Sequence, residues 1–333
     1  MMNNQSDTGI LSCIGNTPLV QLTRIFPASS IQLFGKLEMF NPGGSIKDRT
    51  AYNILKNAID KGILHENSTV IESTSGNMGI GLARICHFLG LKLILVTDPH
   101  INEMCVSILK TFNANIITVT QHDGKGGYLN TRLEKVQQLL SEIPNSFWPN
   151  QYHNMDNPLA HEQTYSEIVL TLGKNPDYIY VSTSTCGTLR GLADAIAKYN
   201  AHTKIIAVDA KGSVIFDDLP QKRIIPGMGA SRKSTFIQME QVHQVVHISD
   251  QETVEGCYQL LDTESILAGG SSGAIVKAME KTISQLPENE TVVAVFPDNG
   301  ERYLQTIYSE EWVNQNFKVE NNDLENGTHQ SKY

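Results

Sequence analysis

Residues 68–97, which read STVIESTSGNMGIGLARICHFLGLKLILVT, contain a strand pattern, a helix pattern and a second strand pattern in that order. The run STVIEST (68–74) is apolar and of strand length, residues 76–90 have helical periodicity that ends at Gly90, and LKLILVT (91–97) has the composition of a buried strand. Two buried strands joined by a helix predict parallel strands covered by helices. This stretch therefore favours the α/β class of fold.

The same alternation continues along the rest of the chain. Helical patterns follow at 102–112, 128–143 and 161–173, and apolar strand patterns at 114–120, 177–183, 203–210 and 291–297. A chain of 333 residues is too long for one simple core and suggests about two domains. Because ligands in such folds bind at the carboxyl ends of parallel strands, we expect the functional side chains in the loops after residues 73, 183, 209, 268 and 296.

The composition argues against several classes of protein. The net charge of −9 disfavours nucleic acid as a partner, because a protein that binds phosphate backbones is expected to be basic. The five cysteines form no CxxC pair and no His/Cys cluster at zinc spacing, which argues against a disulfide framework and a structural metal. The polar N-terminus and the lack of an apolar run of ~20 residues predict no signal peptide and no membrane span. We therefore expect a soluble, cytoplasmic protein.

Two loops open a predicted helix with small polar residues. In STSGNMG (73–79), the backbone N–H groups of the helix start could hold a carboxylate, although Ser75 or Asn77 could equally be an ordinary N-cap. STSTCGTLRG (182–191) combines hydroxyl side chains and a glycine at a helix start, which suits a phosphate group. A plain capped helix is the alternative for this loop as well.

The stretch NPGGSIKDR (41–49) places Lys47 behind a Pro-Gly-Gly turn, where a helical pattern begins. A lysine that forms a Schiff base must lose its proton, and burial beside a cofactor lowers its pKa. The glycines would let the backbone approach a planar ligand closely. The alternative is a surface lysine at a helix start, where its charge opposes the helix dipole. GGSSGA (269–274) is a further run of small residues that would let a flat group lie close, or would serve packing alone.

A lysine after a glycine turn, a carboxylate loop, a phosphate loop and a small serine loop are together the parts that a pyridoxal phosphate enzyme needs. With these motifs in this order, residues 9–310 resemble the cysteine synthase and cystathionine β-synthase family, which has the fold of the tryptophan synthase β subunit. That resemblance implies fold type II, an α/β architecture of two domains, each with a mostly parallel sheet covered by helices. The matching motifs are IGNTPLV (14–20), NPGGSIKDR (41–49), TSGN (74–77), GTLRG (187–191), GGSSGA (269–274) and GERYL (300–304).

The resemblance implies pyridoxal 5′-phosphate as the cofactor and suggests which residues bind it. Lys47 would form the Schiff base and move the α proton, Asn77 would hydrogen-bond the phenolic oxygen, and Ser271 would lie at the pyridine nitrogen. A neutral serine there would not hold a proton on the ring, which suits elimination better than transamination. The cofactor phosphate would be held by Ser184, Thr185, Cys186, Gly187 and Thr188. The substrate carboxylate would be bound by Thr74, Ser75 and Gln151.

The resemblance also divides the chain. Residues 46–150 would form a small mobile domain that closes when a substrate carboxylate binds, and residues 9–45 and 151–310 would form a large domain. Residues 311–333 are expected to be a C-terminal tail that is flexible after a short helix, because the sequence from about residue 309 becomes polar and loses its periodicity. The family implies amino acids as substrates and a homodimer as the assembly.

Several positions depart from the usual cysteine synthase pattern. The phosphate loop normally reads Gly-Thr-Gly-Gly-Thr, but here Ser184 and Cys186 replace two glycines; Tyr152 replaces a phenylalanine, and Met78 follows TSGN. With the loop 208–232, these features resemble a branch that makes N-(2-amino-2-carboxyethyl)-L-glutamate from O-phospho-L-serine and L-glutamate through an aminoacrylate. Its product leads to 2,3-diaminopropionate in siderophore or antibiotic biosynthesis. Cys186 is more typical of a small loop residue than of a redox group.

The charges of those substrates predict cations at the site. Phosphoserine and glutamate bring about four negative charges to an acidic protein, and arginine suits phosphate and carboxylate best. Arg132 and Arg232 are the candidates, with the Tyr152 hydroxyl as a further polar contact. A solvated helix arginine is the alternative for Arg132, and Lys211 is more typical of a solvated lysine.

Two other functions remain open at this point. One is cysteine synthase or cystathionine β-synthase chemistry with sulfide or homocysteine, from O-acetylserine or O-phosphoserine. The other is a non-catalytic binding or regulatory subunit that keeps the family fold. The joint presence of Lys47, Asn77 and Ser271 argues against the second, because a binding module needs no Schiff-base lysine.

Overall fold

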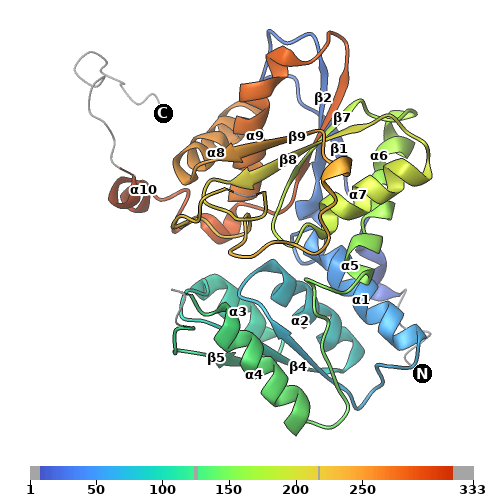
Figure 1. The fold of residues 1–333 in the computed structure, drawn as a ribbon, viewed down its shortest axis with the longest axis vertical. Coiled ribbons are helices and arrows are strands. Elements are labelled where there is room, and N and C mark those ends of the chain that lie inside the picture. The colour runs from blue at the N-terminus through green and yellow to red at the C-terminus, as the bar shows by residue number, and fades with distance from the viewer. Residues whose placement is uncertain (1–7, 124–126, 217, 318–333) are drawn as a thin grey trace.

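A computed structural model of the chain describes residues 8–123, 127–216 and 218–317. The strands form two sheets that lie in separate halves of the molecule (Figure 1). One sheet has six strands in the order β1-β2-β10-β7-β8-β9, and the other has four in the order β5-β4-β3-β6. All neighbouring strands are parallel except β1 and β2, so the predicted α/β class with mostly parallel sheets is confirmed.

The four-stranded sheet is built from the stretch that first indicated the fold. Neighbouring residues of β3 point to opposite faces of the sheet: Val70 packs with helices α1, α2 and α3, whereas Ile71 packs with α4. Each face is therefore covered by helices. The elements are β3 (Thr69–Ser73), β4 (Lys92–Thr97), β5 (Asn115–Thr118), β6 (Ser146–Phe147), α1 (Lys47–Asp60), α2 (Asn77–Leu89), α3 (Glu103–Thr111) and α4 (Leu129–Glu142).

The six-stranded sheet is also covered on both faces. Val181 and Ile205 lie in a core with α6 and α7, whereas Tyr180 and Ile206 lie in the opposite core with α8 and α9. The elements are β1 (Leu19–Gln21), β2 (Gln32–Leu37), β7 (Tyr178–Ser182), β8 (Lys204–Ala210), β9 (Gln244–Ile248), β10 (Thr291–Phe296), α5 (Asp156–Leu159), α6 (Glu162–Leu172), α7 (Gly187–Lys198), α8 (Asp250–Glu264), α9 (Gly270–Thr282) and α10 (Glu310–Asn316). Short 3₁₀ turns lie at η2 (Gly9–Cys13), η3 (Glu38–Phe40), η4 (Met239–Gln241), η5 (Ile283–Gln285) and η6 (Glu301–Tyr303).

The chain passes between the two sheets twice. It leaves the six-stranded sheet after β2 and η3, and it returns after β6. Near the first passage, the amide of Ile46 donates to the carbonyl of Pro297 at 2.8 Å, and Ser45 forms an isolated bridge with Asp298. The start of α1 is therefore tied to the end of β10.

One predicted domain boundary differs from the packing in the structure. Leu11 packs in the core of the four-stranded sheet, although residues 9–45 were expected to belong to the other domain. Residues 310–316 form α10, the short helix that was expected at the start of the tail, and Trp312 and Phe317 pack beside Tyr303 and Ile307. The cluster that packs with this short helix also includes Ile225, Val254 and Cys257. The rest of the predicted tail, 318–333, lies outside the described residues.

Strands β1, β2, β6 and β9 were not predicted. They are short, or they carry glycine and polar residues, as in QLFGKL of β2 and QVVHI of β9. Within the described ranges, no helix has the length and apolar character needed to cross a membrane. The same ranges contain no group of three or more His, Cys, Asp and Glu side chains arranged to hold a metal ion.

Candidate active site

A cavity of about 510 Å³ lies between the two sheets, at the carboxyl ends of β7 and β10 and the first turns of α1, α2, α7 and α9. This volume includes space that is open to solvent. The structure brings together here every residue that was predicted to bind the cofactor. The lining includes Lys47, Asn77, Ser184, Thr185, Cys186, Gly187, Thr188, Ser271 and Asp298.

Lys47 is the first residue of α1, and its side chain is half-buried at the cavity. Burial lowers the pKa of its amine below the usual range, and the nearby Cys186 thiol and Asp298 carboxyl oppose this effect only in part. A lysine with a lowered pKa supplies a neutral amine more readily near pH 7. The chemistry expected of Lys47 is therefore favoured by its surroundings.

The glycine turn before Lys47 has a steric cause. Gly44 has φ +76°, a left-handed conformation that side chains rarely adopt, and a Cβ on Gly43 would collide with the carboxylate of Asp48. That carboxylate accepts from the Gly43 amide, while the Gly44 amide donates to the Asn41 carbonyl at 2.7 Å. The turn can therefore fold tightly against the first turn of α1, and this contact sets where Lys47 begins the helix.

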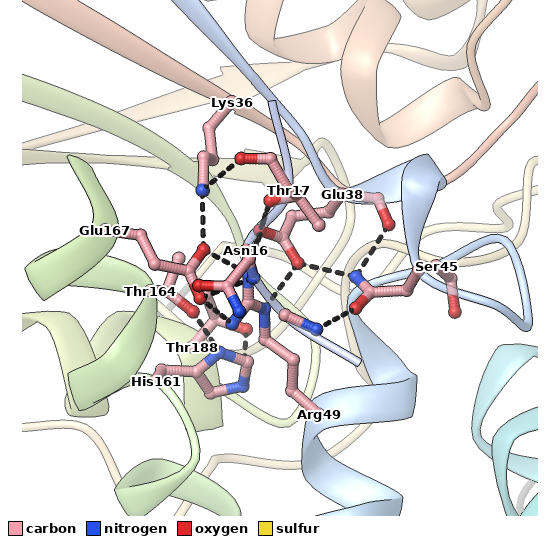
Figure 2. A network of polar contacts seen from close by, with 12 residues as sticks. Asn16, Thr17, Lys36, Glu38, Ser45, Arg49, His161, Thr164, Glu167 and Thr188 are labelled. Atoms are coloured by element: carbon pink, nitrogen blue, oxygen red, sulfur yellow. Dashed lines mark hydrogen bonds and ion pairs between the residues drawn. The ribbon is translucent and has the colours of Figure 1, made fainter. Parts of the chain in front are cut away.

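A buried network of charged side chains also fixes the first turn of α1, through Arg49, as Figure 2 shows. The guanidinium of Arg49 donates to Glu38 and to Glu167 at 2.7 Å each, and Lys36 donates to Glu167 at 2.6 Å. Although burial alone would raise the pKa of Glu167, hydrogen bonds from Arg49 and Lys36 lower it to about 2. Removal of one partner would leave a buried charge unpaired, which typically costs about 3–5 kcal/mol.

The predicted phosphate loop ends in the first turn of α7, where Gly187 and Thr188 line the cavity. Helix starts of this kind favour anions. Gly187 is required here, because a Cβ would collide with the side-chain amide of Asn157, which also donates to the Thr185 hydroxyl at 3.3 Å. Behind the loop, buried His161 lies within 3.3 Å of the Thr188 hydroxyl. Burial, with the charges of Lys47 and Arg49, lowers the pKa of His161 well below its usual value, so it is neutral.

Cys186 precedes that helix in a left-handed conformation, with φ +67°. Its thiol is buried and packs with Ile215 and Phe236. Burial raises the pKa of the Cys186 thiol to about 12, so the reactive thiolate is scarce near neutral pH. These surroundings agree with a small side chain that fills the loop.

Asp298, Arg302 and Tyr303 were given no role from the sequence, but they form a hydrogen-bonded group with Asn77 and Ser271 at the cavity. Asp298 accepts from Asn77 Nδ2 at 2.8 Å, from the Tyr303 hydroxyl at 2.7 Å and from the Ser271 hydroxyl at 3.5 Å. Arg302 donates to Asn77 Oδ1. The Asn77 amide is therefore fixed with one N–H on Asp298 and the other available to a ligand. The motif GERYL and the loop after residue 296 were the signals that could have pointed to Arg302 and Asp298.

Thr74 and Ser75 directly precede the first turn of α2. The residues that line the cavity do not include the predicted substrate residues Thr74, Ser75, Gln151, Tyr152, Arg132 and Arg232. Thr74 and Gln151 are buried, and the guanidinium of Arg132 donates to the Ser75 hydroxyl at 3.3 Å and pairs with Asp98 at 3.0 Å. This contact argues against a purely solvated helix arginine at position 132. The carbon of the Arg232 guanidinium lies 4.2 Å from the centre of the Tyr152 ring, a cation–π geometry.

The charges of Arg132 and Arg232 both affect the pKa of Tyr152. Burial raises the pKa of Tyr152, and the charges of Arg232 and Arg132 oppose this rise. Arg132 comes from α4 beside the four-stranded sheet, whereas Arg232 comes from the loop after β8. The two cations that were inferred separately from the sequence therefore both influence Tyr152, and Arg132 also contacts Ser75.

Comparison with known proteins gives a consistent result. A family model described as pyridoxal-phosphate dependent enzyme matches residues 10–298. The O-acetylserine dependent cystathionine beta-synthase from Helicobacter pylori has a TM-score of 0.84 and 30% identity, with 91% of this chain and 99% of that chain covered. The O-acetyl serine sulfhydrylase isoform 3 from Entamoeba histolytica has a TM-score of 0.84 and 32% identity, with 90% and 91% covered. An O-ureido-L-serine synthase has a TM-score of 0.83 and 27% identity, with 94% and 97% covered.

Proposed function

Because this chain belongs to the pyridoxal-phosphate dependent enzyme family and is a β-replacement enzyme of the cysteine synthase type, we propose that it joins O-phospho-L-serine to L-glutamate. The products would be N-(2-amino-2-carboxyethyl)-L-glutamate and phosphate. The observation that supports this choice of substrates is the pair of arginines at Tyr152. Two cations that contact Ser75 and Tyr152 suit anionic substrates, whereas sulfide or a neutral ester would need neither cation.

The residues of the cavity fit pyridoxal phosphate. The start of α7, which admits only glycine at position 187, suits the phosphate, and Lys47 would hold the cofactor through its amine. The remaining N–H of Asn77 would reach the phenolic oxygen, and Ser271 would lie at the ring nitrogen. When bound, this cofactor supplies the electron sink that lets the Cα–H bond of an amino acid break and a group leave its Cβ.

The protein's own groups would carry out the remaining tasks. Lys47, with its lowered pKa, would take the proton from Cα of the donor and later return it to Cα of the product. Thr74, Ser75 and Gln151 would bind the donor's α-carboxylate. Arg132 and Arg232 would bind the departing phosphate or the carboxylates of glutamate, and the phosphate would leave with the electron pair of the Cβ–O bond.

Gly187→Ala is expected to weaken binding of pyridoxal phosphate roughly 5- to 100-fold, since forcing a methyl group against Asn157 costs about 1–3 kcal/mol. Absorbance titration of the cofactor-free variant would measure this. Thermal unfolding of the same sample would separate a local change in the loop from loss of the fold. Wild-type affinity in the variant would contradict the assignment of this loop to the phosphate.

A product assay with two donors and two acceptors would test the proposed reaction. O-phospho-L-serine or O-acetyl-L-serine would be combined with L-glutamate or sulfide, and the products identified by mass spectrometry. We expect the glutamate adduct, formed fastest from phosphoserine. Efficient formation of cysteine with no coupling of glutamate would instead support the second candidate, a cysteine synthase, which is favoured by the similarity to enzymes named for O-acetylserine. A protein that binds the cofactor but turns over no donor would support a non-catalytic role.

We also propose that residues 46–150 move as a unit when a donor carboxylate binds, since Ser75 and Asn77 lie at the start of α2 in that unit. The hydrogen bond from Asn77 to Asp298 joins this unit to the other sheet. Structures with and without bound donor would test this, and unchanged positions of Ser75 and Asn77 would contradict it. The homodimer, the cytoplasmic location and the use of the product for 2,3-diaminopropionate stay predictions.

A further inference from the structure

Glu72 is a buried carboxylate at the carboxyl end of β3, two residues before Thr74. Its Oε1 accepts from the Ser73 amide at 2.8 Å and from the Trp148 indole N–H at 3.0 Å, and its Oε2 accepts from the Gln151 amide at 3.3 Å. Trp148 and Gln151 lie on the segment that returns to the six-stranded sheet after β6. Glu72 therefore joins the end of β3, just before the TSGN motif (74–77), to this returning segment.

Gln151 is held from its other side as well. Its carbonyl accepts from Asn157 Nδ2 at 2.7 Å, and the same amide group of Asn157 donates to the Thr185 hydroxyl at 3.3 Å. A continuous path of hydrogen bonds thus runs from Glu72 through the backbone of Gln151 to the loop at the start of α7. The position of Gln151 depends on both ends of this path.

We propose that Glu72 is a positioning residue for the donor's α-carboxylate: its ionised form holds the backbone of Gln151 at the carboxyl end of β3, and its protonation releases Gln151. This inference rests on the proposed role of Gln151 in binding that carboxylate. An ionised carboxylate is an acceptor only and matches the N–H donors aimed at it. A protonated carboxyl has an O–H of its own, so one oxygen becomes a poorer acceptor and one of these contacts weakens.

The surroundings of Glu72 place its protonation near neutral pH. Burial raises the pKa of Glu72 to about 7, although the hydrogen bonds from Trp148, Ser73 and Gln151 act in the opposite direction. Among the described residues, Tyr152 interacts electrostatically with Glu72, and also with Arg232 and Arg132. The sign of the effect on folding follows from linkage. Because the pKa of Glu72 in the folded state lies above the ordinary glutamate value of 4.5, the folded state binds more protons between these values, and stability falls as pH rises from about 4.5 to about 7.

The effect on donor binding has the opposite sign. As pH rises through about 7, Glu72 becomes ionised and Gln151 is held, so donor affinity rises over the pH window in which this group's contribution to stability is lost. A residue with only a structural role would not couple donor affinity to pH in this way.

Trp148 supplies a direct reporter of the Glu72 contact. The chain has two tryptophans, so Trp312→Phe leaves Trp148 as the only one. In this background, we expect the fluorescence of the protein as purified to change with pH around a midpoint of about 7. Glu72→Gln should abolish the transition. Asp250→Asn should keep it: Asp250 is a matched control, a carboxylate that accepts the Ile224 amide at 2.7 Å and does not line the cavity.

Steady-state kinetics would then distinguish a role of Glu72 in donor binding from a role in the stability of the fold. At pH 8, Glu72→Gln is expected to raise KM for O-phospho-L-serine about tenfold with kcat within about twofold, because uniform binding is lost. Below about pH 6 the difference from wild type should shrink, since wild-type Glu72 is then protonated too. Comparison of variant with wild type at each pH cancels the titration of the donor itself.

Each outcome bears on the proposal. A pH transition that persists in Glu72→Gln, or a KM that is unchanged at pH 8, would overturn it. If Glu72→Gln does not fold, Trp148→Phe removes one donor and leaves Glu72 intact. The pKa of Glu72 then rises, and the midpoint of the KM profile should move to higher pH; an unmoved midpoint would overturn the proposal. Failure to couple any donor would refute the proposed function, whereas the fluorescence result would stand independently of it.

Discussion

Lys47→Ala is expected to lower turnover by roughly 10²–10⁴-fold, the usual contribution of a positioned acid–base group. Lys47 lines the cavity beside Asn77 and Ser271, and burial lowers the pKa of its amine. An alanine can neither hold the cofactor covalently nor move the proton at Cα of the donor. Steady-state assays with phosphoserine and glutamate would measure the loss, and wild-type protein should be yellow with bound cofactor.

Chemical labelling gives a second measurement that does not depend on turnover. Borohydride reduction of the wild-type protein followed by peptide mapping should mark Lys47. Lys61→Ala, a change at the exposed C-terminal end of the same helix, is the control and should leave colour, label and rate unchanged. A label on another lysine, or a protein that stays colourless after cofactor is added, would refute the assignment.

Arg232→Ala is expected to reduce kcat/KM for O-phospho-L-serine about ten- to a hundredfold and to have much less effect with O-acetyl-L-serine. Loss of one charge-assisted contact costs about 1.5–3 kcal/mol, which converts to this range. In the part of the chain that the structure describes, no carboxylate forms an ion pair with Arg232, whereas Arg132 is partly neutralised by Asp98. The charge of Arg232 is therefore the more available of the two.

The comparison of the two donors decides this prediction. Arg24→Ala, which removes an exposed arginine outside the cavity, should leave the ratio of the two kcat/KM values unchanged. An equal loss for both donors in Arg232→Ala would mean that Arg232 does not bind the phosphate. Arg132, which reaches Ser75, would then be the residue to change next.

Much of the architecture could be predicted because it depends on local periodicity. The stretch 68–97 forms β3, α2 and β4 as expected, and Gly90 ends α2 in a left-handed conformation. Strand β2 was missed for a physical reason. Its Lys36 looks unsuited to a core, yet it is fully buried because Glu167, far along the chain, neutralises it. Periodicity carries no information about such a pair.

The site shows the same division. Lys47, Asn77 and Ser271 belong to motifs that are recognisable when they occur together, and the structure brings them to one cavity. Glu72 and Asp298 were overlooked because their importance arises from the groups that they contact. Trp148 lies 76 positions from Glu72, and Asn77 lies 221 positions from Asp298. A single acidic residue before TSGN or after a strand gives no sign of these partners.

The position of β10 has a consequence for the order in which the protein can form during synthesis. The strands and helices of the four-stranded sheet are complete once residue 147 has left the ribosome, so their contacts can form early. The six-stranded sheet cannot close at that stage, because β10 lies between β2 and β7 and is the last strand to be made. Pairing β2 with β10 requires closure of a loop of more than 250 residues, which is entropically slow. We therefore expect the four-stranded sheet to form first in the nascent chain. The edges of β2 and β7 would stay unpaired, and accessible to chaperones, until β10 is synthesised.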